Sequence, residues 1–295
     1  MSCPVFRGVG TALITPFTKE GTVDYNKISS LVEIQIAAGT NAIIACGTTG
    51  EKSTLRHLEH VKVIQTIIET VNGRIPVVAG TGSNDTEYTV ELSHEAEKLG
   101  ADALLMVTPY YNKTSQSGLI RHYNYVADRV NTPIILYNVQ SRTGMNILPE
   151  TYAQLCNHPN IVATKEANGD ISALAKTIAL CEGKLHVYSG NDDQTLPMVA
   201  MGAKGVISVF SNLNPQAMNK LTHLALTGDF PKAMVLQNKY LPLMNAMFCD
   251  VNPVPVKEAM NQIGLDVGTC RMPLGEVSKE NREKIHSLLS LAEML

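Results

Sequence analysis

One lysine of this sequence stands where lysine is unusual. Residues 161–167 form an apolar run of strand character, and Lys165 lies near its far end. Lysine is rarely buried, because burial penalises the charged form of its amine. An amine that burial keeps neutral is a nucleophile that can attack a carbonyl carbon. Lys165 is therefore a candidate for covalent catalysis, and the alternative is a strand-end lysine whose amine reaches solvent.

Two threonines stand between two glycines in the motif Gly47-Thr48-Thr49-Gly50, directly after another apolar run. Glycine lets a ligand approach the backbone closely, and the hydroxyls and backbone N–H groups of such a turn suit a small carboxylate. The motif therefore indicates a carboxylate site, with a solvated turn of the same sequence as the alternative.

Two further side chains complete a possible reaction centre. Tyr137 ends an apolar run and could carry a proton to or from an intermediate that forms on an amine. Arg142 offers a planar fork for a second carboxylate. The alternatives are a core tyrosine bonded to the backbone and an ordinary ion pair on a loop.

Combined with Lys165, these groups make up a Schiff-base aldolase centre. The amine condenses with the ketone of a 2-oxo acid, and the protonated imine acidifies the adjacent methyl group, which gives an enamine carbon nucleophile. Glu166 is a poor catalytic candidate, because side chains alternate along a strand and Glu166 should point away from Lys165. We expect no metal, since His57 and His60 have no evident third ligand, and no cofactor beyond the imine on Lys165.

The elements that must position these residues are short apolar runs separated by helical patterns. Near-continuous apolar character is typical of strands that are covered on both faces. The alternation predicts an α/β fold, a (β/α)8 TIM barrel, with a doubly wound sheet as the alternative. In a barrel the active site lies at the carboxyl ends of the strands, where Thr48, Tyr137 and Lys165 would then meet. The runs are residues 11–15, 41–46, 75–79, 102–107, 133–137, 161–165, 185–189 and 204–209.

Helix starts are also marked in the sequence. Asn84 with Glu87 suggests a capping box, in which the asparagine caps the helix and the glutamate bonds back to it. Asn214 before Pro215 suggests an N-cap followed by proline in the first helical position. We therefore expect helices to begin at these two places.

After residue 228 the strand pattern stops. Residues 230–248, 254–263 and 278–294 have helical periodicity, and no linker rich in Ser, Gly or Pro precedes them. We therefore predict a catalytic barrel over residues 1–228 and a C-terminal helical segment over residues 229–295 that packs on the barrel.

Composition excludes several classes of function. The 295 residues carry a net charge of −3 with no run of Lys or Arg, so we expect no binding to nucleic acid or to an anionic membrane. The six cysteines form no C-x-x-C pair, which indicates reduced thiols and a cytoplasmic protein. The sequence shows neither a secretory signal pattern nor an apolar stretch long enough to span a membrane.

Over essentially its whole length the chain resembles the 4-hydroxy-tetrahydrodipicolinate synthase (dihydrodipicolinate synthase) family of pyruvate-dependent Schiff-base lyases. The resemblance implies condensation of pyruvate with L-aspartate 4-semialdehyde, in the diaminopimelate route of lysine biosynthesis. It also implies a homotetramer built as a dimer of dimers. The motifs that carry it are residues 47–51, 75–82, 107–112, 136–139, 141–144, 165–167 and 205–209.

The resemblance also implies roles for individual residues. Lys165 would form the imine with pyruvate, and Tyr137 would carry protons. Thr48 and Tyr111 would complete a hydroxyl relay with Tyr137, and Tyr111 would come from the neighbouring subunit. The binding positions would be Thr48 and Thr49 for the pyruvate carboxylate, Arg142 for the carboxylate of the semialdehyde, and Gly190 and Ile207 along the pyruvate pocket.

Two alternatives remain at this stage. Lyases of N-acetylneuraminate or of 2-keto-3-deoxy sugar acids share the lysine and the tyrosine, although their loops resemble residues 141–144 poorly. A barrel that binds a 2-oxo acid without turning it over is the other alternative. The combination of Lys165, Tyr137, Thr48 and Tyr111 argues against it.

The chain departs from the family pattern in three places. Gln140 stands where proline is usual, so the loop before Arg142 should be less constrained. In the inhibitor site of lysine-sensitive members, Lys52 replaces a small residue and Tyr88 replaces a glutamate, which adds a cation and removes an anion near a cationic ligand. We therefore expect weak or absent inhibition by L-lysine. The positions that correspond to this site are Lys52, His57, His60, Asn84, Tyr88 and Tyr110.

Overall fold

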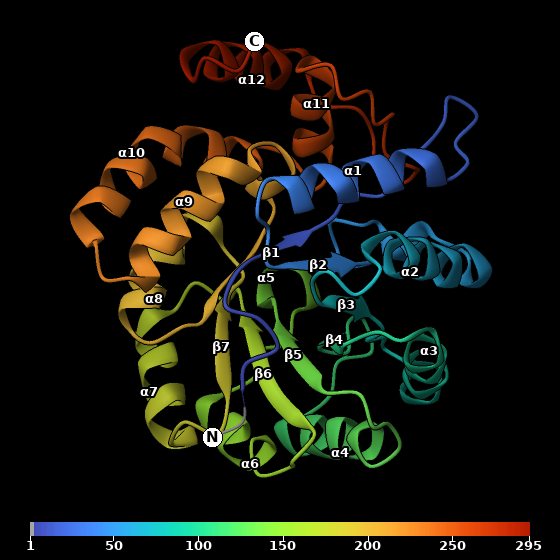
Figure 1. The fold of residues 1–295 in the computed structure, drawn as a ribbon. Coiled ribbons are helices and arrows are strands. Elements are labelled where there is room, and N and C mark those ends of the chain that lie inside the picture. The colour runs from blue at the N-terminus through green and yellow to red at the C-terminus, as the bar shows by residue number, and fades with distance from the viewer. Residues whose placement is uncertain (1–2) are drawn as a thin grey trace.

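Eight parallel strands close into a barrel in the computed structural model, which describes residues 3–295 (Figure 1). Each strand pairs with the next, and β8 pairs with β1, so the predicted (β/α)8 barrel is confirmed. The strands are β1 Gly8–Ala12, β2 Ala42–Ala45, β3 Val77–Gly80, β4 Ala103–Val107, β5 Ile134–Asn138, β6 Ile161–Glu166, β7 His186–Ser189 and β8 Gly205–Ser208.

Helices surround the barrel, and every strand is buried apart from Val162, which is partly exposed. This double cover explains why the strands read as apolar runs rather than as alternating patterns. The longer helices are α1 Tyr25–Ala37, α2 His57–Val71, α3 Thr86–Leu99, α4 Gln116–Ala127, α6 Pro149–Leu155, α7 Ile171–Cys181, α8 Thr195–Ala200 and α9 Pro215–Leu226, and a short helix α5 spans Gln140–Thr143.

The first strand lies three residues earlier than the sequence predicts. Its pairing with β8 brings Gly8 opposite Gly205, where a Cβ added at Gly205 would lie 1.8 Å from the oxygen of Gly8. Two backbones this close require glycine, and glycine adds nothing to an apolar pattern. Residues 13–15 belong to the core beyond the strand, where the N–H of Ile14 donates to the side chain of Asn212 at 3.1 Å.

One of the two predicted helix caps is wrong by one residue. Asp85, not Asn84, caps α3, because its carboxylate accepts from the N–H groups of Glu87 and Tyr88 at 2.9 and 3.2 Å. The other cap is confirmed: the side chain of Asn214 accepts from the N–H of Ala217 at 3.0 Å. The start of α9 was therefore predicted correctly, and that of α3 one residue too early.

Three helices follow the barrel: α10 Phe230–Ala246, α11 Val254–Gln262 and α12 Lys279–Leu291. The predicted division at residue 228 lies in the turn between α9 and α10, which pack against each other. In Figure 1 these last helices cover one side of the barrel, with α11 and α12 beyond α1. The main hydrophobic core contains Val9 and Phe210 of the barrel together with Val256 and Ile285 of this segment, so the core crosses the division.

Aromatic packing fills part of the barrel interior near the end where the strands begin. The ring of Phe6 stacks on that of Tyr188 with 4.2 Å between the ring centres, and the Tyr188 hydroxyl donates to the carbonyl of Phe6 at 2.7 Å. The carboxyl ends of the strands are the end at which a barrel of this kind binds its ligands.

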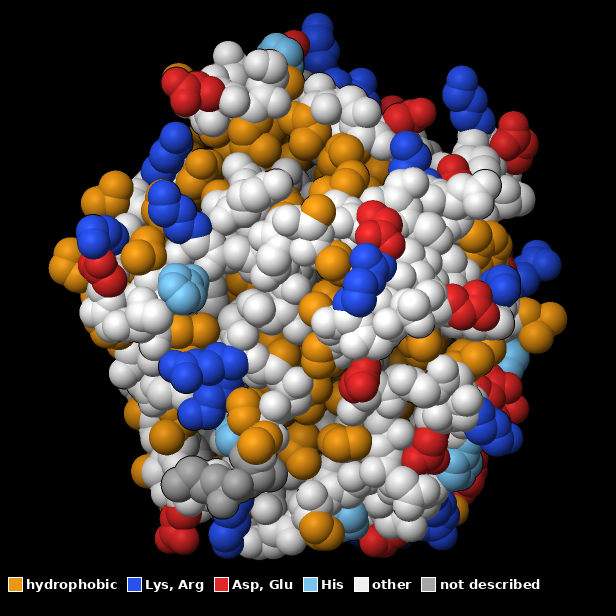
Figure 2. All heavy atoms as spheres, in the orientation of Figure 1, with side chains coloured by type: hydrophobic (Ala, Val, Ile, Leu, Met, Phe, Trp, Pro, Cys, Tyr) orange, Lys and Arg blue, Asp and Glu red, His pale blue; other side chains and the backbone are white. Residues whose placement is uncertain are grey.

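The surface agrees with the near-neutral composition. Positive and negative side chains are intermixed on the face that Figure 2 shows, and neither sign forms a broad patch there. Within residues 3–295 no helix is long and apolar enough to cross a bilayer.

Candidate active site

The side chains of Lys165 and Tyr137 lie side by side inside the carboxyl end of the barrel. The two residues are register partners on β6 and β5, and the Nζ atom of Lys165 lies 4.3 Å from the centre of the Tyr137 ring. Their exposed fractions are 4% and 6%. No hydrogen bond or ion pair within residues 3–295 occupies the amine, so it is buried and available for chemistry.

A buried carboxylate lies near this amine. Oδ2 of Asp192 accepts from the N–H groups of Val209 and Phe210 at 3.1 and 2.9 Å, whereas Oδ1 is buried without a hydrogen-bond partner in the described chain. Burial raises the pKa of Asp192, and hydrogen bonds together with the positive charge of Lys165 act in the opposite direction. The sequence places Asp192 among the polar residues just after the seventh strand but gives it no role, because nothing in the pattern distinguishes it from its neighbours.

The turn of residues 47–50 is held in an unusual backbone conformation. The residues on either side of it, Cys46 and Glu51, both have φ of 53°, in the left-handed region. The N–H of Gly50 donates to the carbonyl of Gly47 at 3.1 Å, and that of Glu51 to the carbonyl of Thr48 at 3.1 Å. The N–H groups of Thr48 and Thr49 are bonded to nothing in the described chain, so the turn presents two free donors.

Arg142 lies on α5, the short helix that follows β5. Its side chain is exposed, and its Nη2 atom donates to the main-chain oxygen of Asn252 at 3.3 Å. The side chain of the same asparagine donates through Nδ2 to the hydroxyl oxygen of Thr49 at 3.0 Å. Asn252 lies in the C-terminal segment, and no sequence pattern connected it with the site.

Gly190 directly follows β7, and Ile207 lies on β8. A Cβ added at Gly190 would lie 2.6 Å from the Cβ of Ala167, so only glycine fits there. Ile207 is fully buried and belongs to the same interior cluster as Tyr137. Gly190 therefore packs closely against the end of β6, and Ile207 forms part of the barrel interior.

Glu166 points out of the barrel, as the alternation along β6 predicts. Its carboxylate accepts from Tyr152 of α6 at 2.9 Å, from Asn138 at 3.1 Å and from the N–H of Asn168 at 2.9 Å. Burial raises the pKa of Glu166 to about 7 against the lowering effect of these bonds. The residue fixes the end of the strand from outside the reaction centre.

Tyr111 does not reach the other candidate residues within one chain. It is 93% exposed, and its φ of 69° turns the backbone into the left-handed region. No hydrogen bond within residues 3–295 joins the hydroxyls of Thr48, Tyr137 and Tyr111. A relay through Tyr111 would need a second copy of the chain.

The residues that correspond to an inhibitor site lie together around α2 and the turns after β2 and β3. The amine of Lys52 donates to the carbonyl of Gly82 and lies 5.9 Å from the centre of the Tyr110 ring. Burial lowers the pKa of Lys52 to about 8. The chain thus places its own amine within this cluster.

The two histidines of this cluster have different partners. The rings of His57 and Tyr88 are joined by a bond of 3.2 Å between Nδ1 and the hydroxyl, and His60 Nε2 lies 3.0 Å from the carbonyl of Gly80. Burial, followed by the charge of Lys52, lowers the pKa of His60 to about 4. Within residues 3–295 no group of three or more His, Cys, Asp or Glu side chains is placed to hold a metal ion.

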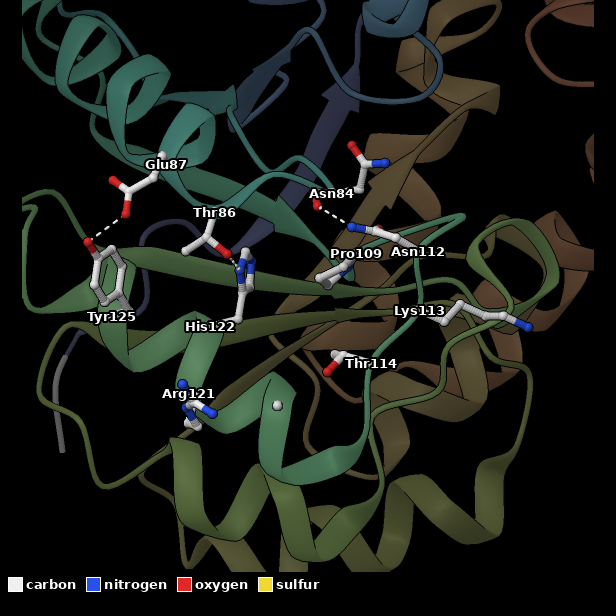
Figure 3. A pocket seen from close by; sticks show the side chains of 11 residues that line it. Asn84, Thr86, Glu87, Pro109, Asn112, Lys113, Thr114, Arg121, His122 and Tyr125 are labelled. Atoms are coloured by element: carbon white, nitrogen blue, oxygen red, sulfur yellow. Dashed lines mark hydrogen bonds between the residues drawn. The ribbon is translucent and has the colours of Figure 1, made fainter.

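A separate cavity of about 510 Å³ lies outside the barrel, between α3, α4 and the loop that carries Tyr111 (Figure 3). Two hydrogen bonds lie in its walls. One joins the Thr86 hydroxyl and Nδ1 of His122 at 2.9 Å, and in the other the Tyr125 hydroxyl donates to the Glu87 carboxylate at 2.6 Å. The carbonyl of Asn84 accepts from Asn112 at 2.9 Å at its rim. None of the candidate catalytic residues lines this cavity.

The chain is similar in sequence to a family of known proteins. Residues 5–292 match the model of the dihydrodipicolinate synthetase family. The chain is 50% identical over 286 residues to a 4-hydroxy-tetrahydrodipicolinate synthase of Caldicellulosiruptor saccharolyticus. The matched stretch covers 97% of each protein.

Two solved structures are also closely similar. Dihydrodipicolinate synthase of Acinetobacter baumannii, solved in complex with pyruvate, has a TM-score of 0.96 and 44% identity, over 98% of this chain and 99% of that one. The enzyme of Cyanidioschyzon merolae, solved with lysine bound, has a TM-score of 0.96 and 35% identity, over 99% and 100% of the two chains.

Proposed function

The chain belongs to the dihydrodipicolinate synthetase family, and from that premise we propose that it condenses pyruvate with L-aspartate 4-semialdehyde, as a 4-hydroxy-tetrahydrodipicolinate synthase. It is a Schiff-base lyase of lysine biosynthesis. The observation that carries the mechanism is the buried amine of Lys165, 4.3 Å from the Tyr137 ring and in the same barrel mouth as the turn of residues 47–50.

The first step is imine formation. The free N–H groups of Thr48 and Thr49 bind the pyruvate carboxylate, and Gly190 and Ile207 enclose the rest of this small substrate. The amine of Lys165 adds to the ketone carbon, and loss of water gives the protonated imine. The buried carboxylate of Asp192, which interacts electrostatically with Lys165, would stabilise that positive charge.

The second step makes and uses the carbon nucleophile. Loss of a methyl proton from the imine gives the enamine, whose carbon attacks the aldehyde carbon of the semialdehyde. Arg142 binds the carboxylate of this second substrate. The amino group of the semialdehyde then displaces Lys165 from the imine carbon, which closes the ring and frees the enzyme. The chemistry needs no added cofactor.

Protons move through hydroxyl groups in this proposal. Tyr137 exchanges protons with the intermediates, and Thr48 and Tyr111 complete the relay. The exposed position of Tyr111, 93% accessible in the single chain, supports its insertion into the mouth of a second copy. The assembly we propose is a homotetramer built as a dimer of dimers, and the free thiols of the cysteines support a cytoplasmic location.

We also propose that L-lysine inhibits this enzyme weakly or not at all. Lys52 already places a cation beside Tyr110, and Tyr88 offers no negative charge to a second amine. A steady-state titration that gives half-inhibition below about 1 mM would show this proposal to be wrong.

Product analysis tests the proposed reaction against the alternative of a sugar-acid lyase. Incubation with pyruvate and the semialdehyde should consume both in equal amounts and yield a single cyclic product by nuclear magnetic resonance. The same enzyme should release no pyruvate from N-acetylneuraminate or from 2-keto-3-deoxy sugar acids. Cleavage of either acid at a comparable rate would contradict the assignment.

A further inference from the structure

Asn252 bonds to the binding groups proposed for both substrates. Its Nδ2 atom donates to the hydroxyl oxygen of Thr49 at 3.0 Å, and its main-chain oxygen accepts from Nη2 of Arg142 at 3.3 Å. It lies between α10 and α11 and is only 5% exposed. One residue of the C-terminal segment therefore connects the two carboxylate sites.

The direction of the side-chain bond determines what Thr49 can do. Because the amide donates, the Thr49 oxygen accepts and its hydroxyl hydrogen stays free to donate to a carboxylate. A hydroxyl that accepts one bond is also polarised to donate the next one more strongly. Asn252 thus prepares Thr49 to bind an anion.

The fold alone gives little reason for an amide in this position. Oδ1 of Asn252 is buried and has no hydrogen-bond partner within residues 3–295, so the side chain makes a single bond. A buried polar group whose acceptor oxygen is unpaired costs stability. Such a cost is common where a side chain serves a site rather than the fold.

Neighbouring contacts keep the segment in place independently of Asn252. The amine of Lys257 pairs with Glu51 at 2.6 Å, and the N–H of Arg271 donates to the same carboxylate at 3.0 Å. Glu51 directly follows the turn that carries Thr49. Removal of the Asn252 side chain should therefore leave the segment docked.

We propose that Asn252 is a positioning residue for both substrates. Its side chain orients the Thr49 hydroxyl for pyruvate, and its main-chain carbonyl holds Arg142 for the semialdehyde. This inference rests on the proposed function, which assigns Thr49 and Arg142 to the two carboxylates.

Two variants test the side chain: alanine removes its hydrogen bond, and aspartate keeps its shape but replaces the donor by an acceptor. Asn252→Ala should raise the KM for pyruvate about ten-fold, in line with the loss of one hydrogen bond to an anion site, and should change kcat and the KM for the semialdehyde less. Asn252→Asp should raise the KM for pyruvate further, because a carboxylate would accept the Thr49 hydrogen and repel the anionic substrate.

A merely structural role predicts the opposite order, since aspartate keeps the shape of asparagine. Asn261→Ala is the matched control: its Nδ2 donates to Gly268 at 3.0 Å and its Oδ1 accepts from Val267 at 2.7 Å, all within the same segment. It should lower the melting temperature and leave the KM for pyruvate unchanged.

The result that overturns the inference is a KM for pyruvate within two-fold of wild type in Asn252→Ala, or tighter pyruvate binding in Asn252→Asp than in Asn252→Ala. A wild-type enzyme that forms no product from the two substrates would instead refute the proposed function. The wild-type assay therefore separates the two failures, and thermal unfolding shows that each variant is folded.

Discussion

The two central residues of the reaction centre are available for chemistry because their polar groups make no hydrogen bonds within the described chain. The amine of Lys165 and the hydroxyl of Tyr137 are buried in a protein interior where polar groups usually pair, yet neither makes a hydrogen bond in the described chain. Groups left free in this way are available to substrate. Their positions follow from β6 and β5, whose register brings them opposite each other.

Removal of the Tyr137 hydroxyl should therefore affect catalysis more than folding. We expect Tyr137→Phe to lower kcat about 100-fold, because a positioned proton carrier contributes at least that much. Tyr188→Phe is the control, since it removes a buried hydroxyl of the same barrel interior that is bonded to the backbone of Phe6. Steady-state kinetics should show kcat near wild type for this control. More than a tenth of wild-type kcat in Tyr137→Phe would refute the role.

A buried histidine should make the fold sensitive to acid. Burial lowers the pKa of His122 from 6.5 to about 4, so between these values the unfolded chain binds a proton that the folded chain does not. The free energy of unfolding therefore decreases as the pH falls from 6.5 toward 4, and His122 contributes up to about 3 kcal/mol to this loss. Urea unfolding at pH 7 and pH 5 should show a smaller loss for His122→Gln than for wild type. Equal losses would mean that His122 does not contribute.

At the scale of elements, the C-terminal segment is tied to the active-site turn by buried charge. Lys257 of α11 and Glu51 are 2.6 Å apart, and both side chains are almost fully buried. Burial lowers the pKa of Lys257, while Glu51 raises it. The pair connects α11 to the residue that ends the turn of residues 47–50.

Breaking this pair from one side should be costly. Lys257→Met would leave the buried Glu51 carboxylate without its paired cation, with the N–H of Arg271 still bonded to it, so we expect a loss of about 3–5 kcal/mol in unfolding free energy together with weaker pyruvate binding. Lys176→Met, which removes an exposed partner of Glu150, is the control and should cost less than about 1 kcal/mol. Denaturant titrations measure both values. Similar losses in the two variants would contradict the special role of the buried pair.

The sequence predicted elements better than it predicted contacts between them. The apolar runs predicted the positions of the strands except that of β1. Close packing requires glycine at Gly8 and Gly10 of this strand, and glycine does not contribute to an apolar pattern. The side chains at the ends of strands, such as Lys165, could be assigned because a barrel fixes where those ends meet. Asn252 and Lys257 could not, because their contacts with Thr49 and Glu51 join distant parts of the chain that no periodicity links.

At the scale of the whole molecule, a single chain leaves the proposed relay incomplete. Tyr111 is exposed on a loop whose backbone is held in the left-handed region, so its hydroxyl can serve only a neighbour's active site in this account. The oligomer is then part of the catalytic unit, and subunit exchange should be visible in activity.

Mixed oligomers test this directly. Tyr111→Phe and Lys165→Ala subunits should each be nearly inactive alone. When they are mixed, some sites combine an intact Lys165 with an intact Tyr111 from the partner, so activity should return to about a quarter of wild type. Activity that stays at the level of the separate variants after confirmed subunit exchange would rule out a contribution across the interface.

The central claim is that Lys165 forms the covalent intermediate, and reductive trapping tests it most directly. Intact mass should be measured after treatment with pyruvate and sodium borohydride, for wild type and for Lys165→Ala, followed by peptide mapping. We expect one pyruvate-derived adduct per chain, located on Lys165 and absent from the variant. An unmodified wild-type enzyme, under conditions that trap a control aldolase, or an adduct on another lysine would contradict it.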